Sequence, residues 1–189
     1  MISKKQLMRE ARKTGLNLYQ QEKDYLLKLF LYNYYRRFSD GVFKGGTCIK
    51  YLYGLNRFSE DLDFNLSTSP REFQTQTHKT LGEIRLLGIK NYFLKEESFP
   101  DAYTCEIAFY GPLHEGSSQT RNKFRIDAGE RTGTHRKPVW QRIKSDYPET
   151  PPTFLALSMS DKELLAEKIH ALNQRKKASD LQPATCNLQ

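Results

Sequence analysis

The chain has 189 residues, 38% of them hydrophobic and 28% charged, and 30 basic against 22 acidic residues give a net charge of +8 at pH 7. This length allows one domain with a buried core, and the composition excludes a fibre or a disordered tail. No apolar run approaches the roughly 20 residues that a membrane helix needs, and the N-terminus MISKKQLMRE lacks the apolar part of a signal peptide. We therefore expect a cytoplasmic protein without membrane contact, whose basic excess suits RNA but is weak evidence alone.

The cysteines and histidines indicate neither a disulfide framework nor a zinc site. The cysteines are odd in number and widely spaced, the histidines are scattered, and no Cys-x-x-Cys pair occurs. These residues are Cys48, Cys105, Cys186, His78, His114, His135 and His170. We expect reduced thiols, and we expect any bound metal to have oxygen ligands.

The first part of the chain predicts a helix, a strand, a glycine turn and a short helix. Apolar side chains recur at helical spacing over residues 17–38. Residues 41–44 form a short, partly apolar run that the Gly45-Gly46 pair breaks. Residues 47–53 then fit two helical turns that end at Gly54.

Residues 61–66 alternate between polar and apolar side chains, which predicts a strand. Asp61 and Asp63 then lie on one face and point the same way. The Ser69-Pro70 pair that follows predicts the start of a helix ending at Gly88.

Three further strands are expected in the second half of the chain. Residues 103–109 alternate clearly, whereas residues 89–94 are less regular. Residues 123–128 alternate again, so that Asp127 faces away from the core.

The last part of the chain predicts a long connection and a final helix. Residues 131–152 are rich in Pro, Arg, Lys and Thr and show little periodicity, which predicts a surface connection and a boundary between lobes. Residues 160–163 have the form of a capping box for a helix that runs to Arg175. We therefore assign residues 1–150 to a core and residues 151–189 to a C-terminal helical segment.

The glycine turn and the aspartate pair predict two halves of one ligand site. The carboxylates of Asp61 and Asp63 repel each other unless a cation lies between them, and Mg²⁺ accepts carboxylates together with substrate phosphates. Gly45 and Gly46 let the backbone approach a ligand, and the N–H groups that start the next helix can donate to phosphate oxygens. The ligand that satisfies both halves is a metal-bound nucleoside triphosphate.

Each of these motifs also has a plain structural explanation. An Asp-x-Asp pair on a strand is more often a solvated face than a metal site, and a Gly-Gly pair before a helix is usually only a turn. The ordered combination favours the ligand site, because a third carboxylate, Asp127, stands on the polar face of a later strand.

Residues 45–66, GGTCIKYLYGLNRFSEDLDFNL, resemble the signature of the AbiEii/AbiGii-type nucleotidyltransferase toxins, which include the MenT toxins. A second segment, EKIHAL at 167–172 and RKKASDL at 175–181, resembles a later motif of that family. The resemblance spans about residues 22–181. It implies an α+β fold of the DNA polymerase β type, with a mixed β-sheet flanked by helices and a short or truncated C-terminal helical part.

The resemblance also implies roles for individual residues. The catalytic metal ligands would be Asp61, Asp63 and Asp127. The residues that bind the nucleotide would be Gly45, Gly46, Thr47, Arg57, Ser59 and Lys168, and the further catalytic residues would be Lys168 and Asp180. Without the resemblance, Lys168 is more simply a solvated helix residue, and Asp180 is a helix cap or an ion-pair partner of Arg175 or Lys176.

The chain departs from the family after Leu181. Members generally continue with an aromatic-rich helix, whereas Pro183 here removes a helical N–H and clashes with the preceding turn. We therefore expect a truncated C-terminal part, with an uncovered apolar surface that favours a homodimer.

Together these features predict a nucleotidyltransferase that uses Mg²⁺ or Mn²⁺ and moves a nucleoside monophosphate from an NTP to an RNA hydroxyl, with the 3′ end of tRNA as the expected acceptor. The resemblance implies the toxin of a toxin–antitoxin pair, with a cognate antitoxin as partner. One alternative is the same transfer to a small-molecule or protein hydroxyl. Another is a non-catalytic, truncated homologue that binds nucleotide without turnover.

Overall fold

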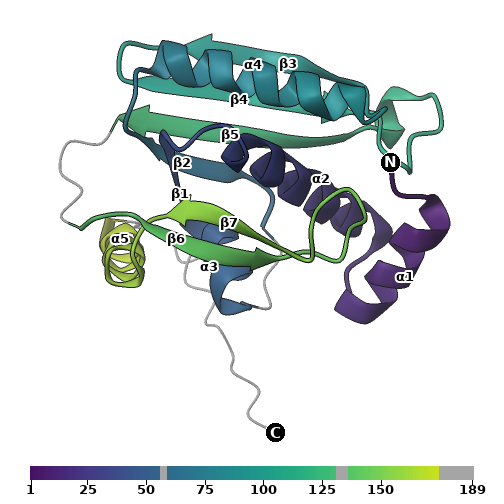
Figure 1. The fold of residues 1–189 in the computed structure, drawn as a ribbon, viewed down its shortest axis with the longest axis horizontal. Helices are drawn as coiled ribbons and strands as arrows, with labels where there is room; N and C mark the ends of the chain where they lie inside the picture. Colours follow the sequence, from purple (N-terminus) through teal and green to yellow (C-terminus); the bar gives the residue numbers. More distant parts are fainter. Residues whose placement is uncertain (56–58, 131–135, 175–189) are drawn as a thin grey trace, which may run out of the picture.

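The computed structural model describes residues 1–55, 59–130 and 136–174, whose strands form one mixed sheet in the order β3-β4-β5-β2-β1-β7-β6 (Figure 1). The strands are β1 (Gly41–Lys44), β2 (Leu62–Leu66), β3 (Asn91–Ser98), β4 (Ala102–Phe109), β5 (Asn122–Glu130), β6 (Val139–Lys144) and β7 (Thr153–Ser158). The helices are α1 (Lys4–Thr14), α2 (Leu18–Tyr35), α3 (Gly45–Tyr53), α4 (Pro70–Leu86) and α5 (Asp161–Gln174), with a short 3-10 turn at Ser118–Thr120. The predicted α+β fold, a mixed sheet flanked by helices, is confirmed.

The pairing of the central strands brings distant parts of the sequence together. Strand β2 is antiparallel to β1 and parallel to β5, while β1 is also parallel to β7. Parallel neighbours need a crossover connection, which α4, β3 and β4 supply between β2 and β5. Lys44 of β1, Asp63 of β2 and Asp127 of β5 consequently lie in register.

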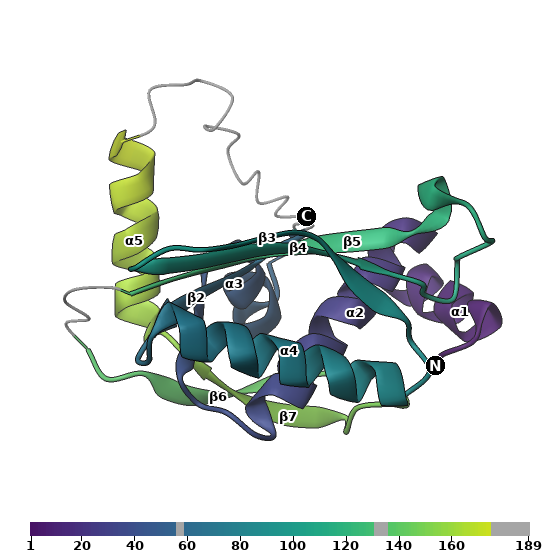
Figure 2. The same cartoon turned by 90° about the horizontal axis from the view of Figure 1, so that it is seen from above.

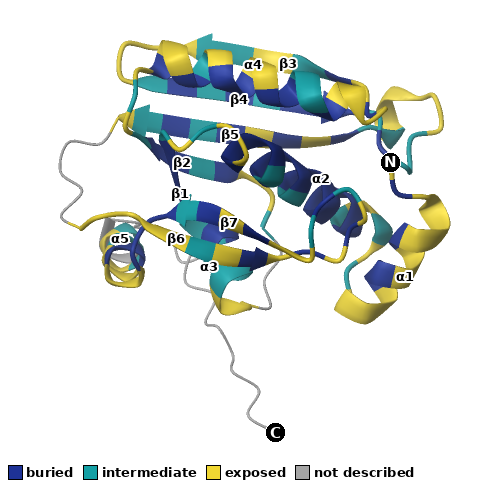
Figure 3. Cartoon of the chain, in the orientation of Figure 1, coloured by how far each residue is buried: buried dark blue, intermediate teal, exposed yellow. Residues whose placement is uncertain are grey.

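The core lies where α2 and α4 cover one face of the sheet (Figures 1 and 2). The ring of Phe64 on β2 contacts Tyr34 of α2 and Phe73 of α4, with ring centroids 5.8 Å and 5.3 Å apart. Buried residues concentrate on α2 and the central strands in Figure 3. Each large apolar side chain buried here stabilises the fold by roughly 1.5–3 kcal/mol.

The elements predicted between residues 17 and 128 are confirmed, with shifts of a few residues at their ends. Gly54 ends α3 in the left-handed conformation, at φ 67°. The Ser69 hydroxyl accepts a hydrogen bond from the Glu72 N–H and caps α4, as the Ser-Pro start predicts.

The prediction of a surface connection over residues 131–152 is wrong, because this segment contains the edge strand β6. Trp140, Arg142 and Lys144 of β6 are exposed, and Ile143 is the fully buried side chain of the strand. A strand with so little buried surface shows weak periodicity in its sequence.

Strand β7 was not predicted either. It pairs with both β1 and β6, so no lobe boundary separates the segment before it from the sheet. Because β7 also follows residue 150, the residues after 150 contribute a strand to the sheet as well as the helix α5.

The helix α1 was not predicted, although it begins with a capping box between Ser3 and Gln6. Its residues are largely basic, and Leu7 and Ala11 are the apolar side chains that it buries. A helix that buries so few side chains leaves little apolar signal in the sequence.

The helix α5 begins where the capping box at 160–163 predicts, but the side-chain bonds of the box are not formed. Among the described residues, Ser160 Oγ and Glu163 Oε1 have no hydrogen-bond partner. The turn is instead closed by the Ser160 carbonyl, which accepts from the Leu164 N–H at 2.9 Å.

Two further expectations concern the thiols and the membrane. Cys48 and Cys105 are buried free thiols, as expected, and Cys186 lies outside the described residues. None of the helices in the described part of the chain is long and apolar enough to cross a membrane.

Candidate active site

Four polar side chains form a row across the face of the sheet opposite the core. Lys44 of β1 is in register with Asp63 of β2, which is itself in register with Asp127 of β5. Thr104 of β4 lies on the far side of Asp127. Neighbouring strands are about 4.8 Å apart, so the structure brings together the carboxylates of Asp63 and Asp127, 64 positions apart in the numbered sequence.

Protein donors occupy one oxygen of Asp127. Thr104 Oγ1 donates to Asp127 Oδ1 over 2.8 Å, and Arg125 reaches the same oxygen with Nε at 2.9 Å and a terminal guanidinium nitrogen at 2.7 Å. These donors fix the direction of the carboxylate. Among the described residues, none donates to the other oxygen, Oδ2, which can accept a further ligand.

The carboxylates at the start of β2 lie in an electrostatically unfavourable place. Burial raises the pKa of Asp63, and the neighbouring charge of Asp127 raises it further. Lys44 and Lys168 act in the opposite direction on the Asp63 pKa. Burial also raises the pKa of Asp61, while a hydrogen bond from the Arg125 backbone N–H lowers it. A cation between these carboxylates would relieve this cost.

The glycine turn at the start of α3 packs directly against Asp63. Gly45 has φ 76°, and a Cβ atom built on it would lie 2.0 Å from Asp63 Oδ2. A Cβ on Gly46 would lie 3.1 Å from Ser59 Oγ. The residue at the N-cap, Lys44, makes no side-chain capping bond. The N-terminal end of α3 therefore faces the carboxylates, as the combination of motifs predicts.

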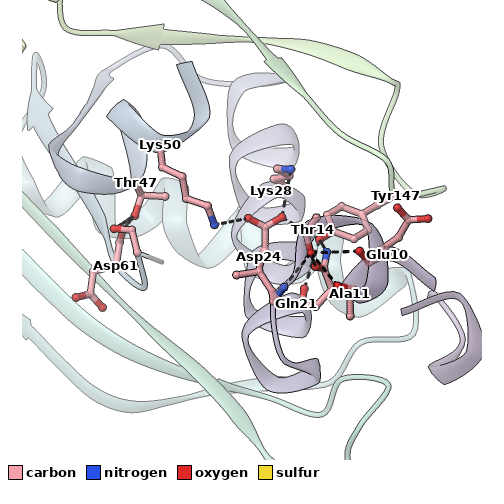
Figure 4. Close-up of polar contacts among 12 residues, drawn as sticks. Glu10, Ala11, Thr14, Gln21, Asp24, Lys28, Thr47, Lys50, Asp61 and Tyr147 are labelled. Atoms are coloured by element: carbon pink, nitrogen blue, oxygen red, sulfur yellow. Dashed lines mark hydrogen bonds and ion pairs between the residues drawn. The ribbon is translucent and has the colours of Figure 1, made fainter. Parts of the chain in front are cut away.

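Thr47 ties α3 to the residues before β2. Its hydroxyl lies 2.5 Å from the Asp61 carbonyl oxygen and 2.7 Å from Ser59 Oγ, and Figure 4 shows the contact with Asp61. Because the Thr47 side chain is buried and faces these groups, its hydroxyl positions the segment that carries Asp61.

Lys168 acts on the site from α5, which stands at one end of the sheet in Figure 2. Its charge lowers the pKa of Asp63, so the two side chains lie near each other although they are far apart in sequence. The preceding residue, Glu167, forms an ion pair with Lys44 at 3.2 Å. This pair holds α5 against the edge of the site.

Not every predicted site residue is placed by the structure. Arg57 and Asp180 lie outside the described residues. Within the described ranges, no three acidic, histidine or cysteine side chains lie close enough together to enclose a metal ion. The three predicted metal ligands, Asp61, Asp63 and Asp127, are therefore not gathered into one such group in the described part of the chain.

A cleft of about 460 Å³ opens on the polar face beside the aspartates. Its polar lining includes Lys44, Asp63, Asn65, Thr104, Arg125, Asp127 and Glu130. Lys44, Asn65, Thr104 and Arg125 were not predicted as site residues. The alternation of β2 and β5 does place Asn65 and Arg125 on the polar face, but Thr104 and Lys44 join the site only through the pairing between strands.

Residues 30–181 match the model of a protein family described as the nucleotidyl transferase AbiEii toxin of a type IV toxin–antitoxin system. The chain belongs to the AbiEii family. This confirms the family that residues 45–66 predict. No curated protein matches the chain at a significant level.

Solved structures with the same fold include a nucleotidyltransferase toxin. MenT4, a nucleotidyltransferase toxin from Mycobacterium tuberculosis H37Rv, superposes with a TM-score of 0.65 at 16% identity, over 90% of this chain and 59% of that protein. JHP933 from Helicobacter pylori superposes with a TM-score of 0.58 at 16% identity, over 85% of this chain and 62% of that one. The AbiEii chain thus spans about three fifths of the length of each structure, and the likeness shows a common fold.

Proposed function

We propose that this AbiEii family member is a divalent-metal-dependent nucleotidyltransferase, which transfers a nucleoside monophosphate from an NTP to a hydroxyl of RNA, at the 3′ end of tRNA. The observation that carries the proposal is the Asp63-Asp127 pair packed against the N-terminal end of α3. Carboxylates packed against helix N–H groups in this way can hold the metal side and the phosphate side of one nucleotide.

The roles of the residues follow from their positions. Asp63 and Asp127, with Asp61 beside them, would hold Mg²⁺ or Mn²⁺, which when bound offsets charge on the attacking and leaving oxygens. Without a Cβ, Gly45 and Gly46 let Asp63 and Ser59 approach the first turn of α3, whose N–H groups would bind the phosphates. Ser59 and Arg57 are further nucleotide-binding candidates, and Asp180 a catalytic one.

Two lysines would balance the charge of the triphosphate. Lys168 and Lys44 both lower the pKa of Asp63, so their ammonium groups lie within electrostatic reach of the aspartate pair. In the transfer, the acceptor oxygen bonds to the α-phosphorus while pyrophosphate leaves on the opposite side. In this proposal the lysines and the α3 N-terminus would offset the negative charge of the leaving pyrophosphate.

Incubation with each labelled NTP and total RNA tests the proposal. Label on RNA, dependent on Mg²⁺ or Mn²⁺, supports it, and sequencing of the labelled ends identifies the acceptor. Label on protein or on a small molecule would show that the acceptor hydroxyl belongs to one of those molecules and not to RNA. Metal-dependent NTP binding with no transfer to any acceptor leaves only a nucleotide-binding protein.

The partners of the molecule form a second part of the proposal. As a family toxin, the protein would act in the cytoplasm and be held inactive by a cognate antitoxin. A homodimer would cover the apolar side chains that α5 exposes, because Leu165 is 62% and Ile169 is 51% exposed. Light scattering on the purified chain tests the homodimer, and a monomer at all concentrations would contradict it.

A further inference from the structure

The cleft beside the aspartates has a second end, away from α3. In register beyond the Asp63-Asp127 row, Asn65 of β2 faces Gly129 of β5, which faces Ala102 of β4. Two residues along a strand correspond to about 6.6 Å. Because Gly129 and Ala102 carry little or no side chain, the floor of the cleft is low here.

The walls of this end are suited to a flat aromatic ligand. Phe99 lines the cleft and is 49% exposed, in a turn that its backbone N–H closes by donating to the Ala102 carbonyl at 2.7 Å. An exposed ring beside a low floor is a platform on which a nucleobase can stack. Glu130 lines the same end and adds negative charge, which disfavours a phosphate at this place.

Asn65 supplies an unused hydrogen-bonding group. The residue is 4% exposed and lines the cleft, and its Nδ2 has no hydrogen-bond partner among the described residues. Buried amides are nearly always hydrogen bonded, so the Asn65 Nδ2 has the capacity to donate to an acceptor, from water or from a ligand, that reaches it through the cleft.

We infer that Phe99, Asn65, Gly129 and Ala102 form a subsite for the terminal nucleoside of the RNA acceptor. This inference rests on the proposed transfer reaction, because an in-line displacement places the attacking hydroxyl opposite the leaving pyrophosphate. The basic, phosphate-binding side of the aspartate row is the α3 side, with Gly45 and Lys168. The opposite side is the end of Phe99 and Asn65, and the acceptor therefore enters there.

The test compares Phe99→Ala with Phe99→Tyr, in steady-state transfer with RNA and NTP varied separately. Because Phe99→Ala removes the stacking of the base on the ring, it should raise the KM for RNA at least about fivefold. The KM for NTP stays unchanged, and Phe99→Tyr, which keeps the ring, stays close to the wild type. Trp140→Ala is the matched control, because Trp140 is similarly exposed, at 46%, on the edge strand β6.

Asn65→Asp and binding of a fluorescein-labelled RNA octanucleotide extend the test. Asn65→Asp replaces the amide donor by a carboxylate of the same shape and is expected to weaken RNA binding, as Phe99→Ala does. A rise in the KM for NTP with an unchanged KM for RNA would assign the subsite to the donor nucleotide and overturn the inference. An unchanged KM for both in Phe99→Ala would also overturn it.

The binding assay separates this inference from the proposed function. If the wild type transfers nucleotide to RNA but Phe99→Ala binds the octanucleotide normally, the inferred subsite is wrong while the proposed function stands. If the wild type transfers nothing to RNA and does not bind the octanucleotide, the RNA-directed function fails, and the subsite with it.

Discussion

At the level of single residues, Asp63 lies between Lys44 of β1 and Asp127 of β5, and these three side chains set the charge of the polar face. Burial and the charge of Asp127 raise the Asp63 pKa, so the folded chain holds this carboxylate at an energetic cost. A carboxylate whose pKa is perturbed by burial together with a specific charged neighbour, beside a cleft, is a candidate for a functional site.

Asp63→Asn should abolish nucleotide transfer while raising the melting temperature of the metal-free protein. In the proposed reaction Asp63 holds the metal, so its loss forfeits several kcal/mol of charge stabilisation, a loss in rate on the order of a thousandfold. The melting temperature rises because the neutral amide relieves the repulsion from Asp127. Transfer assays and thermal melts in EDTA measure the two effects. The exposed Asp146 offers a control, and a fall in melting temperature would show that the carboxylate is structural instead.

Gly45→Ala should abolish transfer because the new methyl group meets Asp63. Its Cβ would lie 2.0 Å from Asp63 Oδ2, and the φ of 76° adds backbone strain of on the order of 1 kcal/mol. Gly54→Ala, at the other end of α3, is the matched control. Gly54 also has a positive φ of 67°, but nothing lies within 4 Å of its added Cβ. Equal loss of activity in both variants would indicate strain in α3 alone and no special approach to Asp63.

The sequence predicted part of this site and missed the rest for a physical reason. Alternation within one strand was enough to place Asp61, Asp63 and Asp127 on polar faces. The other two side chains of the row, by contrast, come from β4 beside Asp127 and from β1 beside Asp63, and the register in which two strands pair leaves no local pattern within either strand. Lys44 and Thr104 could therefore not be predicted as site residues.

Among the secondary-structure elements, α3 is held at two points one turn apart. Thr47 binds the Asp61 carbonyl, and Lys50 forms a buried ion pair with Asp24 of α2 at 2.9 Å (Figure 4). Asp24 also pairs with Lys28 of its own helix at 3.2 Å and accepts from the Tyr147 hydroxyl at 2.9 Å. The pair of Lys50 with Asp24 thus anchors α3 to α2, the central helix of the core.

Lys50→Met should lower kcat by on the order of tenfold to a hundredfold, because α3 loses its anchor and the glycine turn shifts relative to Asp63. Lys28→Met is the matched control: both lysines bind the carboxylate of Asp24, and both side chains are 15% exposed. Lys28 makes no ion pair to α3 among the described residues, although its ammonium lies 5.2 Å from the Tyr51 ring centroid.

Hydrogen exchange of the α3 amides provides a readout that needs no activity. It should speed up in Lys50→Met and stay near the wild type in Lys28→Met, and Lys50→Arg should restore both exchange and kcat. Equal effects of the two methionine variants would mean that the lysines contribute only to stability.

The number of apolar side chains that an element buries explains which elements the sequence predicted. Helices and strands with a wide apolar face, such as α4 and β4, show the period of their structure and were predicted. The edge strand β6 and the basic helix α1 each bury few apolar side chains, and neither was predicted. Their place in the fold depends on neighbours that come later in the chain.

At the level of the whole molecule, α2 joins three separate parts of the chain with three consecutive charged residues. Glu22 is fully buried and accepts from the Leu113 N–H at 2.7 Å, between β4 and β5. Lys23 forms an ion pair with Glu60, directly before Asp61. Asp24 pairs with Lys50 of α3. A helix enclosed on all sides can bury its charged residues, and this environment was not visible in its sequence.

Asp24→Asn should destabilise the protein at pH 7 by about 3 to 5 kcal/mol, because Lys28 and Lys50 would then lose the buried carboxylate that both of them bind. Burial alone would raise the pKa of Asp24, but the two lysines outweigh it and hold the pKa below its ordinary value of 3.8. The stabilisation by Asp24 is therefore fully present above about pH 4 and disappears as the pH falls through the lower, folded-state pKa. Urea unfolding over this range should show the wild type approaching the Asp24→Asn variant as the acid increases. A difference between them that is the same at pH 7 and at pH 2 would show that Asp24 stabilises the fold by packing and not by its charge.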